Sequence, residues 1–230
     1  MVGAMAIEIT VRGAFSMFHR PERGTVQATI AYEDSRMEPV YQRLVTDLDT
    51  VRESIAALHD PDLGPATWWS AEQLRTWSTR PWNKDGKQMP LVHHAAVAVE
   101  VKFRDFAVLS RWVGDCTASI AGFRVTQVDW ALTVKRKDEL LREVRTLAVQ
   151  DAVTRAQQYS DALGLGVVSP GSIADAGMLV AGLHPAGEAS VGPVQPRAGG
   201  ANTAQLELLP NDIEVKAVVD ARFVAEKPSA

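Results

Sequence analysis

The chain has 230 residues, of which 46% are hydrophobic and 23% charged, and its net charge is −4. A domain of this length typically buries roughly 70–75% of the surface of its unfolded chain. Because the hydrophobic residues can supply such a core, the composition excludes wholesale disorder. The acidic balance disfavours a nucleic-acid binder, which usually needs a basic face. A single cysteine, Cys116, excludes an intrachain disulfide and a zinc site built on paired cysteines. We expect it to be a buried apolar residue.

The sequence carries no recognisable membrane or export signal. No stretch approaches the roughly 18 apolar residues that a membrane-spanning helix needs. The first ten residues lack the basic and apolar regions of a secretory signal, and Glu8 interrupts their short apolar run. We therefore expect the chain as given to be cytoplasmic.

Residues 7–12 and 25–32 alternate apolar and polar side chains, which is the period of a strand. Pro21 and Gly24 lie between them and predict a turn. The two segments are therefore predicted to form an antiparallel pair.

Three helices follow from apolar spacings of three and four residues. The first covers about residues 38–58, and the second is short, with Asp105 as its N-cap and its end near Cys116. The third and longest covers about residues 138–163, and its inner face carries alanines at four-residue steps. Such small residues let a helix lie close to a sheet or to a partner helix. Gly164 is the predicted C′ cap.

The remaining strands are predicted between these helices and after them. A strand over residues 67–80, a turn at 83–86 and a return strand over 89–103 form a hairpin. The apolar phase of a strand over 123–134 changes near Gln127, which predicts a β-bulge. Three further strands and one flexible Gly/Pro-rich loop complete the chain, the strands at 165–173, 203–209 and 213–224 and the loop at about 184–202.

In this order of elements, hairpins outnumber parallel crossovers. The sequence therefore predicts an α+β fold in which amphipathic helices pack on one face of an antiparallel β-sheet. We expect residues 1–230 to form a single domain.

The motifs of common catalytic and cofactor sites are missing from the sequence. Gly164, Gly166 and Gly171 close a helix and open a strand, whereas a dinucleotide loop follows a strand and opens a helix. His93 and His94 are adjacent in a predicted strand, so their side chains point to opposite faces. The sequence thus predicts no catalytic residue, no metal site and no cofactor.

Four tryptophans within fifteen residues are the most unusual feature of the chain: Trp68, Trp69, Trp77 and Trp82. On an unbroken strand, Trp69 and Trp77 would share one face and Trp68 would lie on the other. Aromatic side chains are enriched in cores and at interfaces. We expect one face to be core and the other to be a subunit interface or a ligand groove.

Several motifs resemble, in order, those of the SIMPL-domain family across nearly the whole chain. They are the opening Ile-Thr-Val-Arg-Gly of residues 9–13, the aromatic-rich hairpin from Thr67, the alanine-stepped helix ending in Ala162-Leu-Gly, and residues 209–219, which read Leu-Pro-Asn-Asp-Ile-Glu-Val-Lys-Ala-Val-Val. The resemblance implies an α+β fold and homo-oligomers. Bacterial members are often periplasmic or envelope proteins, some linked to oxidative stress and some assembled into rings or channels. An animal member is associated with kinase signalling. The resemblance supplies no catalytic residue, and this sequence departs from it in lacking an export signal.

Three hypotheses about function follow. The leading one is a non-enzymatic, self-assembling SIMPL-like domain, with a stress- or envelope-related scaffold as its role. The alternative is a small-molecule binding protein that uses the tryptophan-rich hairpin as a pocket wall. The third is an enzyme whose acidic or histidine side chains converge only in three dimensions.

Overall fold

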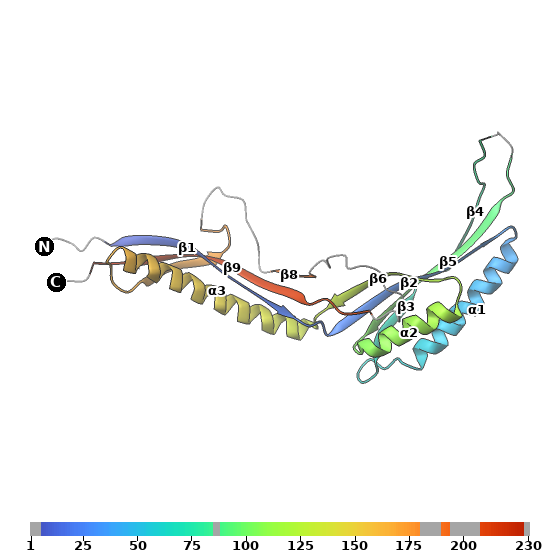
Figure 1. The fold of residues 1–230 in the computed structure, drawn as a ribbon, viewed down its shortest axis with the longest axis horizontal. Helices are drawn as coiled ribbons and strands as arrows, with labels where there is room; N and C mark the ends of the chain where they lie inside the picture. The colour runs from blue at the N-terminus through green and yellow to red at the C-terminus, as the bar shows by residue number, and fades with distance from the viewer. Residues whose placement is uncertain (1–5, 85–87, 180–189, 194–207, 228–230) are drawn as a thin grey trace. The chain divides into compact units, whose positions relative to one another are not determined.

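The computed structural model describes residues 6–84, 88–179, 190–193 and 208–227. Its helices and antiparallel strands confirm the α+β class (Figure 1). The chain folds as two compact units, and neither is one continuous stretch of sequence. Unit 1 takes Met1–Arg20, Leu132–Pro196 and Asn211–Ala230, and unit 2 takes Pro21–Ala131 and Arg197–Pro210. Our expectation that residues 1–230 behave as one domain stays a prediction.

Unit 1 is an antiparallel sheet with one long helix on it. The strand order is β1-β9-β7, and the short β8 also pairs with β9. The helix α3 packs on β1 and β9. The elements are β1 (Ile7–His19), α3 (Val134–Ala162), β7 (Ser169–Asp175), β8 (Ser190–Pro193) and β9 (Ile213–Ala225).

The alanine-stepped face of α3 lies directly against the sheet. Ala148, Ala152 and Ala156 are fully buried in the core of unit 1. Gly13 of β1 comes so close that a Cβ there would overlap the carbonyl oxygen of Ala148 and lie 2.8 Å from Ala152 Cβ. Of the two partners considered for this face, a sheet or another helix, the structure shows the sheet. Gly164 ends the helix at φ +65°, which confirms the predicted cap.

Unit 2 is a five-stranded antiparallel sheet with two helices on one face. The strand order is β3-β5-β2-β6, with β4 also paired to β5. The core lies between the helices and the sheet. The elements are β2 (Arg23–Asp34), α1 (Met37–Ala56), β3 (Ala66–Ala71), β4 (Arg75–Thr79), β5 (Val92–Phe103), α2 (Phe106–Ser119) and β6 (Phe123–Ala131).

Two local predictions for unit 2 are confirmed. The Asp105 carboxylate accepts hydrogen bonds from the backbone of Ala107 and Val108, so it caps α2. The β-bulge also lies where the phase change placed it. The register between β2 and β6 shifts next to Gln127 and leaves Thr126 as the extra residue.

The predicted pairing of the first two strands is wrong. β1 pairs with β9 along its whole length in unit 1, whereas β2 pairs with β5 and β6 in unit 2. The turn residues around Pro21 join two different sheets instead of closing a hairpin. Alternation identifies a strand, but the strand's partner depends on which helix its apolar face must cover, and that is a long-range property.

Parts of three predicted segments fall outside the described residues, and one of them is the turn at 83–86, of which residues 85 and 86 are not described. In the predicted loop at 184–202, only Ser190–Pro193 is described, and it forms β8, which the sequence did not predict. Of the predicted strand at 203–209, only residues 208 and 209 are described, and they are not in a strand. No helix in the described part of the chain is long and apolar enough to cross a membrane.

Candidate functional site: the tryptophan face of unit 2

The tryptophans of the predicted hairpin lie on different faces of the sheet. Trp69 is paired with Val101 and packs against the core under the helices. Trp68 is paired with Lys102 on the opposite face and is 43% exposed. Trp77 is 46% exposed, and Trp82, beyond the end of β4, is 82% exposed.

Trp77 shares its face with Trp68, which corrects the expectation that it would lie with Trp69. The predicted strand over residues 67–80 is broken into β3 and β4. Ala71 pairs with Val99 but Arg75 pairs with Ala96, so this edge carries one more residue than β5 over the same distance. One extra residue sends the following side chains to the other face of a sheet.

We call Trp68, Trp77, His94 and Lys102 the tryptophan face. The ammonium nitrogen of Lys102 lies 5.4 Å from the ring centroid of Trp68, a cation–π distance. The rings of Trp77 and His94 stack with centroids 5.1 Å apart and planes 10° apart. β4 and the start of β5 run on past the first residues of α1, so this end of the ribbon extends beyond the helical layer (Figure 1).

His94 links a carboxylate and a hydroxyl group across three strands. Its Nε2 lies 2.7 Å from Thr79 Oγ1 on β4, and its Nδ1 lies 3.3 Å from Glu33 Oε2 on β2. The order of groups resembles that of a catalytic triad. The Glu33 side chain is 70% exposed, however, so water screens its charge. Cross-strand pairing of polar side chains accounts for these contacts, and we assign no catalytic role to them.

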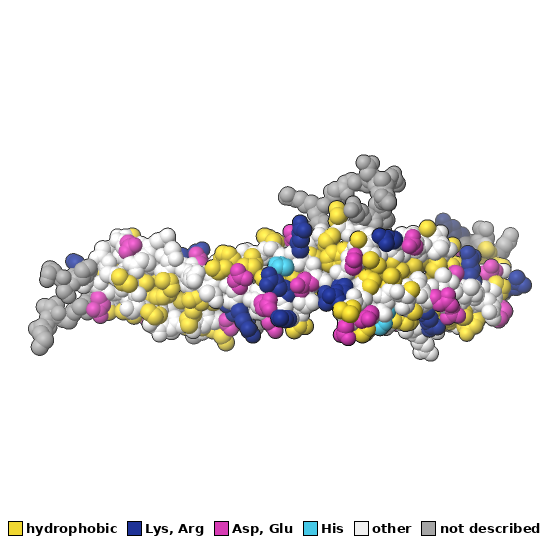
Figure 2. All heavy atoms as spheres, turned by 90° about the horizontal axis from the view of Figure 1, so that it is seen from below, with side chains coloured by type: hydrophobic (Ala, Val, Ile, Leu, Met, Phe, Trp, Pro, Cys, Tyr) yellow, Lys and Arg dark blue, Asp and Glu magenta, His cyan; other side chains and the backbone are white. Residues whose placement is uncertain are grey.

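The described residues contain no cluster of three or more His, Cys, Asp or Glu side chains that could hold a metal ion. His93 and His94 follow the predicted alternation: His93 Nδ1 bonds to Ser78 Oγ, while His94 bonds to Thr79. Basic and acidic side chains are interspersed over the face shown in Figure 2, which is the pattern of a solvated surface.

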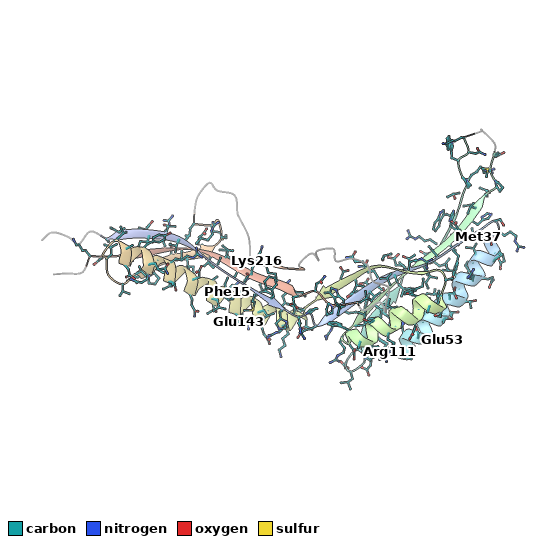
Figure 3. The ribbon with its side chains drawn as sticks, in the orientation of Figure 1. Phe15, Met37, Glu53, Arg111, Glu143 and Lys216 are labelled. Atoms are coloured by element: carbon teal, nitrogen blue, oxygen red, sulfur yellow. The ribbon has the colours of Figure 1, made fainter. Side chains whose placement is uncertain are left out.

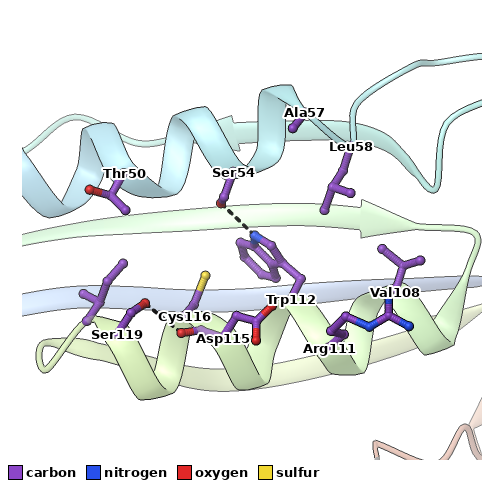
Figure 4. A pocket seen from close by; sticks show the side chains of 11 residues that line it. Thr50, Ser54, Ala57, Leu58, Val108, Arg111, Trp112, Asp115, Cys116 and Ser119 are labelled. Carbon is purple, nitrogen blue, oxygen red and sulfur yellow. Dashed lines mark hydrogen bonds between the residues drawn. The ribbon is translucent and has the colours of Figure 1, made fainter.

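A concave site, which the sequence analysis missed, lies between α1 and α2 (Figure 4). It has a volume of about 280 Å³. Trp112 and Cys116 of α2 lie in it, facing Ser54 of α1. A detectable sequence signal was the row of small residues at positions 50, 54 and 57, beside the apolar stripe of α1.

The family model described as "SIMPL: Protein of unknown function (DUF541)" matches residues 9–223. A search of curated proteins found none that matches this chain.

Proposed function

Because the chain belongs to the SIMPL family, whose function is unknown, we propose from its own surfaces that it is a non-enzymatic domain that assembles with copies of itself through the edge of β4. The observation that carries this proposal is that β4 is a sheet edge with a single charged residue and an exposed tryptophan, Trp77. A free edge presents unpaired backbone groups to any strand of another chain, and most proteins protect such edges.

Two other edge strands, β1 and β6, carry features that protect an edge from pairing. On β1, the backbone N–H of Ala14 donates to the Asp151 carboxylate of α3 at 2.9 Å, so a helix side chain occupies an edge donor. That bond is the largest cause of the lowered pKa of Asp151. β6 carries Arg124, Asp129 and the bulge at Thr126, which are typical of strands that resist pairing.

Among the described residues, β4 has less of this protection. Its partner among the described strands is β5, and all five of its residues are exposed. Arg75, at its first position, is its one charged residue. In a symmetric dimer, β4 would pair antiparallel with β4 of a second copy, because a two-fold contact joins the same patch on both chains. The Trp77 side chains of the two chains would then lie on one continuous face.

The apolar area fits a small interface of this kind. If a tryptophan side chain offers about 250 Å², Trp68, Trp77 and Trp82 together expose about 430 Å² per chain, or about 850 Å² for two chains. A specific interface needs about 1,000 Å² in total. The paired β4 backbones and the exposed side chains of Met89 and Leu91 would supply the difference.

The solution mass tests this proposal. Light scattering over a range of concentrations should give a discrete multiple of the 25.0 kDa chain. Trp77→Lys should shift the mass toward the monomer, because a lysine at this position puts like charges together across the two-fold contact. Phe18→Lys is the matched control: it replaces a 60% exposed aromatic residue on the protected β1 strand and should leave the mass unchanged. A wild-type monomer at every concentration, or equal dissociation by both variants, would refute the proposal.

The second candidate function is small-molecule binding at the tryptophan-rich hairpin. The observation that favours it is the coplanar stack of Trp77 on His94, which offers a flat platform for a planar ring. A ligand there should change the tryptophan fluorescence saturably, and Trp77→Ala should abolish the change while Trp69→Phe, in the core, should not. A stress- or envelope-related scaffold role and a cytoplasmic location stay predictions.

A further inference from the structure

The groove between α1 and α2 exists because the facing side chains are small. Thr50, Ser54 and Ala57 follow one another along α1 and its C-cap, and Cys116 and Ser119 face them from α2 (Figure 4). Four larger side chains also line the groove, namely Leu58, Val108, Trp112 and Ile120. Residues of this size on facing helices leave a space between the helices unfilled.

The polar groups in the groove are already satisfied by one another. Trp112 Nε1 donates to Ser54 Oγ at 3.0 Å, and Ser54 Oγ donates to the carbonyl oxygen of Val51 at 2.7 Å. Burial raises the pKa of Cys116 to about 11, so the thiol is neutral at physiological pH. A ligand in the groove would therefore meet apolar surface and partnered polar groups, with no buried charge to neutralise.

The indole of Trp112 is also held rigidly. Its ring lies 5.5 Å from that of Phe103 and 5.8 Å from that of Phe123, and only 4% of the residue is exposed. A fixed aromatic wall costs little further ordering when a ligand binds.

The rim of the groove carries one charge of each sign. Arg111 and Asp115 are exposed and lie four residues apart on α2, and Figure 3 shows Arg111 on the side of the helix away from the sheet. The two charges have opposite signs, so these rim residues carry no net charge. The rim therefore gives no preference for a cation or an anion.

We propose that this groove binds a small, uncharged, mainly apolar molecule of about two fused rings. An apolar cavity of about 150 Å³ takes benzene, and a site of about 280 Å³ has room for roughly twice as much. The volume lies just below the range of typical drug-sized pockets, which begins at about 300 Å³, so a drug-sized ligand would extend beyond the groove. This proposal goes beyond self-assembly and does not depend on it.

The test uses the full chain and indole as the probe. Equilibrium dialysis should find one indole bound per chain, with a dissociation constant on the order of 0.1–1 mM. Cys116 is the only cysteine in the chain, so its alkylation by iodoacetamide at pH 9 reports on this groove alone. Bound indole should slow the alkylation saturably, with the same dissociation constant.

Ala57→Phe should fill the groove and abolish indole binding. Ala56→Phe is the matched control, because Ala56 is exposed on the same turn of α1 and does not line the groove. The control should bind indole as the wild type does. Absence of binding by the wild type up to 5 mM (about five times the weakest expected dissociation constant), or unchanged binding by Ala57→Phe, overturns the site. Tighter binding of indole-3-acetate or tryptamine than of indole overturns the assignment of an uncharged ligand.

Discussion

Replacing Gly13 with alanine should push α3 slightly away from the sheet of unit 1 and destabilise the fold. The new Cβ would overlap the carbonyl oxygen of Ala148 and would lie 2.7 Å from the backbone nitrogen of Ala152 and 2.8 Å from its Cβ. Carbon atoms in favourable contact are about 3.5–4.0 Å apart, so the helix would have to retreat by roughly 1 Å. The obstructing atoms belong mostly to backbone, which cannot turn aside as a flexible side chain can.

The expected cost is about 3 kcal/mol, the upper part of the range for overpacked cores. A gap of 0.5–1 Å already forfeits about a quarter to a half of each contact's dispersion energy, and the loss extends along the buried face of α3. For a chain of this size, about 3 kcal/mol lowers Tm by roughly 6–12 °C. Gly13 lies outside the left-handed region, so the contact accounts for the cost.

Thermal unfolding followed by circular dichroism measures this effect. Gly114→Ala is the matched control: Gly114 lies inside α2, and a Cβ there meets nothing within 4 Å. That variant should be more stable than the wild type by about 0.5–1 kcal/mol, because alanine is the better helix former. If Gly13→Ala unfolds within about 0.5 kcal/mol of the wild type, the close approach of α3 to β1 does not limit this position, and the reasoning is wrong.

The remaining predictions concern individual groups and cooperativity. The Arg12 guanidinium holds the pKa of Asp220 below its ordinary value, so this carboxylate stabilises the fold above the unfolded pKa, and that stability is lost as pH falls through the lower folded pKa. Asp220→Asn should therefore lower Tm at pH 7, and the difference from wild type should shrink below about pH 4; a constant difference would count against the ion pair. Tyr32→Phe removes a hydroxyl that donates to Asp47 and accepts from the Gly122 N–H at 2.9 Å, and it should cost about 1–2 kcal/mol in urea unfolding. Because the pKa of Cys116 is raised from 9.0 to about 11, its alkylation at pH 8 should be about 100-fold slower in the native than in the urea-unfolded chain. Equal rates would show that the Cys116 thiol is exposed to solvent in the native chain. If residues 1–230 form one domain, calorimetry should give a single transition, and two separate transitions would identify the units as independent domains.

Local chemistry was sufficient to predict several features of this chain. The Asp105 cap, the glycine stop after α3, the alanine face and the bulge beside Gln127 each depend on the order of a few neighbouring residues. The α+β class also followed from the order of elements, and the family from motifs spread along the chain. Such features can be predicted from the sequence because their causes lie within one element or one turn.

The pairing of strands and the faces of the tryptophans required the tertiary structure. β1 pairs with β9, more than 190 residues away along the chain, because both must cover the same alanine face of α3. Trp77 changed face because of one extra residue between β3 and β4, and only the register with β5 reveals it. The groove beside Trp112 likewise depends on which faces of α1 and α2 meet. Partner, register and cavity are properties of two or more elements together, so no single stretch of sequence determines them.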